Sequence, residues 1–144
     1  MIKIICVGKL KEQYLKDAVL DYYKRISKYH KIELIELEDS NIKSEKELIL
    51  KHINRQDYII SLVISGNKIS SLELAKKIDS TFITNSTITF IIGGSNGLDQ
   101  DIINKSNYCL SFSDLTFPHQ LFRVMLLEQI YRSFKILNNE TYHK

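Results

Sequence analysis

The chain has 144 residues, of which 44% are apolar and 26% charged, and its formal net charge is +3. This length favours one domain, residues 1–144, with a core large enough to fold without disulfides or metals. No apolar run approaches the ~18 residues of a membrane-spanning helix, and the opening apolar run is too short for a signal peptide, so we expect a cytoplasmic protein.

Basic residues concentrate at the N-terminal end of the chain. Residues 1–31 hold eight Lys or Arg and three Asp or Glu, whereas the remainder is slightly acidic. Such a surface could meet the phosphate backbone of a nucleic acid. It could equally be the solvated face of a helix, and charge alone leaves both interpretations open.

Five short apolar runs predict strands, and several are continuous enough for strands covered on both faces. They are Ile2–Val7, Ile32–Leu37, Tyr58–Ile64, Thr87–Ile92 and Tyr108–Phe112. Helical patterns lie between them, beginning with a stripe of Leu15, Val19, Tyr22 and Ile26 at helical spacing. Alternating strands and helices predict a single α/β domain with a mostly parallel five-stranded sheet.

Start signals mark four later helices. They are capping boxes at Ser44–Glu47 and Ser70–Glu73, the acidic pair Asp99 and Asp101, and the single proline, Pro118. The helix after Pro118 carries apolar residues around most of its circumference, which predicts burial on more than one side. We expect a subunit interface to supply the second side, and therefore a homodimer, with Arg123 or Arg132 near a shared active site.

A glycine-rich stretch, Gly93–Gly97, follows the fourth strand. It fits the G-x-S-x-G pattern that places a nucleophilic serine, here Ser95, on a strand-to-helix turn. His119 or His143 could complete a hydrolase triad, but the predicted sheet is small and no oxyanion motif precedes the serine. Two other interpretations are open: glycines needed for a tight turn, or a loop whose bare backbone cradles a ligand. The spacing matches neither a dinucleotide fingerprint nor a P-loop.

Two more loops follow strands, Ser65–Asn67 after the third and Ser113–His119 after the fifth. Ligands of open α/β sheets bind beyond the carboxyl ends of the strands, so the three loops should form one pocket. Its hydroxyls, backbone groups and apolar side chains suit an adenosine-like ligand better than a metal. The four histidines show no ligand spacing, and Cys6 and Cys109 are expected to be buried free thiols.

Several ordered motifs resemble one known family. "FIIGGSNGL", "LSFSDLTFPHQLFRVMLLEQIYRSFKI", the terminal "YHK" and the opening "IKIICVGKLKEQYL" are similar to the RlmH family, and the similarity covers essentially the whole chain. The segment Ser40–Asp57 is short for that family. These are SPOUT-class methyltransferases that act on N3 of a pseudouridine in large-subunit (23S) ribosomal RNA.

The resemblance implies a trefoil knot near the C-terminus, a homodimer, S-adenosylmethionine as methyl donor, and ribosomal RNA or the ribosome as partner, without a membrane or a metal. It places the tail pair Tyr142 and His143 at the target base as catalytic residues. It places donor binding on Leu62, Gly93, Phe112, Ser113, Asp114, Leu115, Thr116 and Phe117. On that interpretation Gly93 and Gly94 expose backbone to the donor and Ser95 is incidental. An esterase and a non-catalytic RNA-binding dimer are the alternatives.

Overall fold

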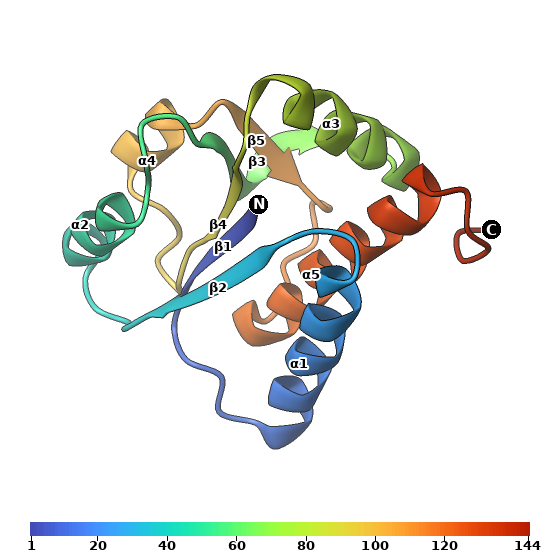
Figure 1. Ribbon diagram of the computed structural model, residues 1–144. Helices are drawn as coiled ribbons and strands as arrows, with labels where there is room; N and C mark the ends of the chain where they lie inside the picture. Colours follow the sequence, from blue (N-terminus) through green and yellow to red (C-terminus); the bar gives the residue numbers. More distant parts are fainter.

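The computed structural model describes residues 1–144, which form five strands and five helices in strict alternation (Figure 1). The strands are all parallel and lie in the order β2-β1-β4-β3-β5. Their bounds are β1 Ile2–Val7, β2 Ile32–Leu37, β3 Tyr58–Lys68, β4 Ile88–Ile92 and β5 Tyr108–Ser111. The predicted fold class is confirmed, and only β3 extends well beyond the expected strand.

Five helices cover the two faces of the sheet (Figure 1). They are α1 Gln13–Ser27, α2 Ile42–Lys51, α3 Ser71–Thr84, α4 Gln100–Lys105 and α5 His119–Leu137. Helices α1, α3 and α5 pack on one face and α2 and α4 on the other. The result is a three-layer α/β/α domain. None of these helices combines the length and apolar character required to cross a bilayer.

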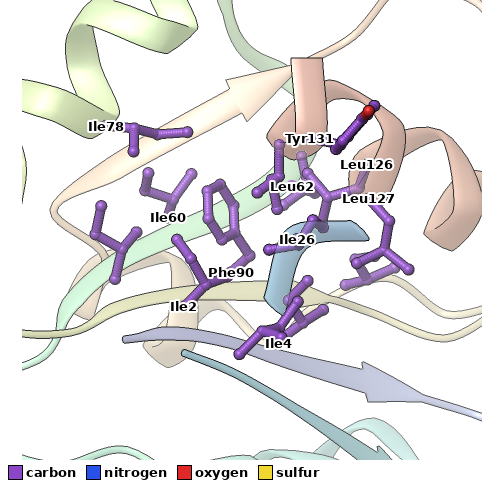
Figure 2. Close-up of a cluster of buried hydrophobic side chains, with 14 of the residues drawn as sticks. Ile2, Ile4, Ile26, Ile60, Leu62, Ile78, Phe90, Leu126, Leu127 and Tyr131 are labelled. Atoms are coloured by element: carbon purple, nitrogen blue, oxygen red, sulfur yellow. The ribbon is translucent and has the colours of Figure 1, made fainter. Parts of the chain in front are cut away.

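The larger core lies under α1, α3 and α5 (Figure 2). Phe90 of β4 is fully buried at its centre, and Ile2 and Ile4 of β1 point to the same side (Figure 2). The alternate residues Ile5 and Val7 pack against the other face, as the two-residue period of a strand requires. Burial on both faces explains why these strands read as continuous apolar runs.

A buried ion pair interrupts the second, smaller core. Lys3 Nζ lies 2.9 Å from Asp57 Oδ2 and also donates to the His52 carbonyl at 2.8 Å. Thr89 Oγ1 donates to the same carboxylate oxygen at 3.0 Å, and so does the Asn54 amide at 3.1 Å. Asp57, the last residue of the segment Ser40–Asp57, is therefore bonded to side chains of both β1 and β4.

The helix starts agree with the sequence at two sites and differ at one. Ser70 and Glu73 form the expected reciprocal capping box, and Asp99 caps α4 through the Asp101 amide. The prediction that Ser44 begins a helix was wrong by three residues. Asn41 is the N-cap, because its side-chain oxygen accepts from the Ser44 amide at 2.9 Å, and asparagine caps as well as serine does.

Helix α5 lies between α1 and α3 on the sheet (Figure 1). Leu126, Leu127, Ile130 and Phe134 are buried in the larger core. The neighbouring helices therefore account for much of the apolar circumference that we attributed to a second subunit. Leu121 is still 42% exposed, so part of the apolar surface stays outside the monomer. The homodimer and the trefoil knot stay predictions.

Candidate functional site

The carboxyl ends of parallel strands meet at one edge, and the loops after β4 and β5 enclose a cavity there with the outer part of β3. Its volume is about 630 Å³, within the range of small-molecule sites. More than half of the lining residues are apolar, and serine and threonine hydroxyls supply most of the polar groups. The lining comprises residues 62–65, 92–95, 97–98, 110–113, 115–117, 119 and 122.

A bulge in β3 brings that strand into the cavity. Leu62 and Asn67 both pair with Leu110 of β5, so the residues between them leave the regular ladder. We expected a loop after residue 64, but the strand continues beyond the bulge to Lys68. Gly66 permits this geometry, because a Cβ there would lie 2.8 Å from the backbone carbonyl carbon and oxygen of Cys109.

The glycine loop after β4 is a tight turn that lines the cavity. The Gly97 amide donates to the Gly94 carbonyl at 3.0 Å, and Gly97 has φ +76°, a conformation that favours glycine. A Cβ on Gly93 would lie 2.7 Å from the Gly97 carbonyl oxygen. A Cβ on Gly94 would lie 2.8 Å from Asp39 Oδ1. Gly93 is therefore required by the backbone of its own turn, and Gly94 lies in close contact with a side chain, which the ligand-cradle interpretation alone did not anticipate.

Ser95 lacks the setting of a nucleophile. It is exposed in the turn between Gly94 and Gly97, and α4 begins only at Gln100. A nucleophile elbow instead places the serine directly between a strand and its helix. No hydrogen bond joins Ser95 to His119 or to a carboxylate. The G-x-S-x-G match is explained by the turn, and the geometry disfavours the esterase interpretation.

The loop after β5 is held in shape by its own serines and aromatic rings. The Leu115 amide donates to Ser113 Oγ at 3.0 Å, and Ser111 Oγ donates to the Ser113 carbonyl at 3.2 Å. The Phe112 and Phe122 rings meet edge to face at 4.8 Å between centroids, and Phe122 also stacks on Phe117 at 5.9 Å. This part of the wall is therefore preformed.

The structure brings together all but one of the eight residues that we assigned to donor binding. Leu62, Gly93 and five residues of the loop after β5 line the cavity. Asp114 does not: its side chain is 82% exposed and pairs with Lys68. Sequence reasoning missed Leu98 and Phe122. Phe122 could have been predicted, because it lies one helical turn after Pro118 and therefore on the same side of the helix as the end of the loop.

The tail pair packs along the C-terminal half of α5, whereas the cavity lies at the N-terminal end of that helix. It is docked on the chain's own helices rather than frayed. The Tyr142 ring packs edge to face on Tyr131 at 5.0 Å, and its hydroxyl donates to Glu128 Oε1 at 3.2 Å. His143 Nδ1 lies 3.0 Å from Arg132 Nη1. Within one chain, Tyr142 and His143 are thus not part of the cavity.

Arg123 lies near the cavity end of α5 but is used structurally. Its side chain is only 4% exposed, and its guanidinium donates to the Gly8 carbonyl at 2.8 Å and pairs with Glu36. These contacts tie α5 to the loop after β1 and to β2, across the sheet from β5. Arg132, further along the same helix, pairs with Glu128.

The two cysteines differ in environment. Cys6 is buried, and burial raises the pKa of its thiol to about 12, so it is an inert packing group at neutral pH. Cys109 is only partly buried, which corrects the expectation that both are enclosed. No group of three or more His, Cys, Asp or Glu side chains is arranged to hold a metal ion.

The fold and the site together define a class: a small α/β domain with a preformed pocket for a nucleoside-sized ligand beyond the carboxyl ends of its strands. Residues 1–143 match the family model described as a predicted SPOUT methyltransferase. The chain belongs to the SPOUT methyltransferase family.

Two relatives illustrate the sequence similarity. The chain is 52% identical to "Ribosomal RNA large subunit methyltransferase H" of Clostridium botulinum, with 99% of each chain covered. It is 46% identical to the protein of the same name from Acetivibrio thermocellus, again with 99% of each covered. Both alignments run over 157 positions, so the relatives carry residues that this 144-residue chain lacks.

Solved structures show the same fold at low identity. One is a "probable methylase family protein" from Haemophilus influenzae, with TM-score 0.62, 14% identity, and 99% of this chain and 70% of that chain covered. Another is the TrmH/SpoU tRNA modifying enzyme of A. aeolicus, with TM-score 0.52, 12% identity, and 95% and 77% covered. At such identities the likeness concerns the fold alone.

Proposed function

We propose that the chain transfers a methyl group from S-adenosylmethionine to N3 of a pseudouridine in 23S ribosomal RNA, on the assembled ribosome and therefore in the cytoplasm. The single observation that carries this proposal is the match, over 99% of both chains, to relatives named ribosomal RNA large subunit methyltransferase H. The specific base and its position within the ribosome come from the family resemblance of the motifs.

The cavity suits the proposed donor. Its volume of about 630 Å³ accommodates a nucleoside with an amino-acid arm. Apolar walls from Leu62, Phe112 and Leu115 would face the adenine ring, and Ser113 and Thr116 offer hydroxyls to polar groups. The donor supplies a methyl group on a sulfonium centre, which is already activated for displacement. The chain has only to bind the donor and orient the acceptor.

A homodimer would complete the site. The cavity reaches α5 at Phe122, whereas His143 contacts Arg132, and ten residues of α-helix span about 15 Å. The tail therefore does not reach the cavity of its own chain. Two copies related by a two-fold axis, with their α5 helices antiparallel, would place each tail over the other's cavity. The exposed Leu121 beside the cavity supports such an interface.

The RNA would lie against the basic N-terminal segment. All five basic residues are exposed: Lys9 and Lys11 on the loop before α1, Lys24 and Arg25 on α1, and Lys28 at its C-cap. Arg25 is paired with Asp21 and Lys9 weakly with Glu38, whereas the other three have no ion-pair partner. Exposed, unpaired cations are the groups that release counterions on a phosphate backbone.

One experiment tests the proposed function. Ribosomes from a strain that lacks this gene are incubated with the protein and labelled S-adenosylmethionine, and the modified nucleotide is mapped. We expect one methyl group per ribosome at one pseudouridine. RNA binding without methyl transfer would favour a non-catalytic binding dimer. Ester hydrolysis that requires Ser95 and no donor would favour the hydrolase.

A further inference from the structure

We infer that Glu128 and Arg132 hold His143 in the tautomer that carries its proton on Nε2, so that His143 meets the target base as a hydrogen-bond donor and not as a proton acceptor. This inference rests on the proposed function, which places His143 at that base. Glu128 and Arg132 act through His143 and are positioning residues.

The first step is the contact between Arg132 and His143. Arg132 Nη1 lies 3.0 Å from His143 Nδ1. A guanidinium has only donors and does not deprotonate in proteins, so Nδ1 must be the acceptor. A neutral imidazole with an accepting Nδ1 carries its hydrogen on Nε2. The Nε2 edge of the ring, which does not contact Arg132, therefore presents an N–H group and no lone pair.

The second step is that Arg132 is fixed in place. Its Nε and Nη2 both donate to Glu128 Oε1, at 2.9 and 2.6 Å, and the two side chains are 25% and 19% exposed. The other carboxylate oxygen accepts from Gln129 Nε2 at 3.1 Å. Gln129 in turn accepts from Ser71 Oγ at 2.7 Å, which anchors the group to α3. The guanidinium has one remaining edge, and that edge faces His143.

The third step is that the tail is docked on the chain's own helices. Glu140 accepts from Tyr29 Oη at 2.8 Å and from Lys135 Nζ at 2.9 Å. The Arg132 guanidinium lies 4.8 Å from the centre of the Tyr142 ring. Burial, followed by the charge of Glu128, raises the pKa of Tyr142 to about 12. Tyr142 therefore stays protonated at neutral pH and is not the base either.

A donor at this position still assists the reaction. The N3–H of the base lies between two carbonyl groups, and loss of its proton spreads negative charge onto their oxygens. An Nε2–H donated to one of those oxygens stabilises that anion, while the proton passes to hydroxide from solvent. N3 then attacks the methyl carbon, and the N–C bond forms as the S–C bond breaks and its electron pair returns to sulfur. One preorganised donor to a developing oxyanion is worth about 10²–10³-fold in rate.

Nitrogen-15 NMR of the histidine rings tests the tautomer directly, without RNA or methyl donor. The chain has only four histidines, so a His143→Ala sample assigns the signal. We expect a protonated Nε2 and an unprotonated Nδ1 in the wild type, and a mixture of tautomers in Arg132→Gln. Arg55→Gln, which removes an exposed arginine elsewhere, should match the wild type. A protonated Nδ1, or a tautomer ratio that Arg132→Gln leaves unchanged, would overturn the inference.

Kinetics of two tail variants test the chemical role. Glutamine offers an N–H near the position of Nε2 but cannot act as a base. We expect His143→Gln to keep turnover within about 10-fold of the wild type and His143→Ala to lose about 10²–10³-fold. If glutamine is as inactive as alanine, His143 is a base and the inference fails while the proposed function stands. If the wild type methylates no ribosome, the proposed function fails, and the NMR result still decides the tautomer.

Discussion

Replacing Gly93 with alanine would put a methyl group inside the turn that ends β4. The added Cβ would lie 2.7 Å from the Gly97 carbonyl oxygen, 2.8 Å from the carbonyl carbon and 3.1 Å from Leu98 Cδ2. The first two atoms are backbone, so the turn itself must open. Opening the turn would weaken or break the hydrogen bond from the Gly97 amide to the Gly94 carbonyl, which is 3.0 Å long.

The expected cost follows from this geometry. Overpacking a close-packed site costs about 1–3 kcal/mol, which for a chain of 144 residues lowers Tm by roughly 3–10 °C. Because the same turn lines the cavity, donor affinity should also fall, by at least about 10-fold if ~1.4 kcal/mol is lost there. Thermal unfolding of the ligand-free protein gives the first quantity, and calorimetric titration with S-adenosylmethionine gives the second.

The ligand-free measurement separates two reasons for the glycine. If Gly93 served only to let the donor approach, Gly93→Ala would weaken binding and leave the ligand-free Tm unchanged, and that result would refute the packing argument. Gly94→Ala is the matched control. Its Cβ meets the Asp39 carboxylate at 2.8 Å and Val7 Cγ1 at 3.0 Å, both side-chain atoms that can shift, so its Tm should fall less. Ser95→Ala should change neither quantity.

Four further outcomes are expected. Sedimentation should show a dimer at micromolar concentration, and Leu121→Asp should weaken it; a wild-type monomer would contradict the shared site. Deleting residues 142–144 should cut turnover far more than donor affinity, whereas an unchanged rate would remove the tail from the reaction. Burial raises the pKa of Cys6 from 9.0 to about 12, so above pH 9 the thiol ionises in the unfolded chain but stays neutral in the folded one. The stabilisation from the neutral thiol is therefore complete below pH 9 and is lost as the pH rises toward 12. The free energy of unfolding should fall by about 1 kcal/mol more by pH 10 in the wild type than in Cys6→Ala. Neutralising basic residues should lower the salt slope of RNA binding by about one unit per lost contact, and an unchanged slope would assign them to a solvated face; they are Lys9, Lys11, Lys24, Arg25 and Lys28.

Local patterns in the sequence were enough to predict the layered α/β fold. Apolar runs located every strand, because a strand covered on both faces must be apolar at successive positions. Helix starts at Ser70 and Asp99 were predictable because capping involves residues two or three positions apart. The start of α2 was predicted wrongly at Ser44, because the Ser44-to-Glu47 pattern also fits a capping box although Asn41 is the N-cap.

The composition of the cavity wall was also predictable in large part. Parallel strands bring their carboxyl ends to one edge, so the loops that follow β4 and β5 were expected at the same edge. The outer part of β3 was predicted as a loop and is a bulged strand, because the pairing of Leu62 and Asn67 with the same residue of β5 is a contact between distant segments. No local pattern specifies such a contact.

Tertiary structure alone decided what the individual side chains do. The sequence by itself determined that Gly93 and Gly94 are glycines in a turn, but only the packing of Gly97 and Asp39 against them gives the reason. It determined an apolar helix α5, but only the positions of α1 and α3 show which of its sides are already buried. It places Tyr142 and His143 near the C-terminus, and only the folded chain brings Glu128 and Arg132 to them. Such contacts depend on distance and orientation in three dimensions, which the order of residues along the chain does not state.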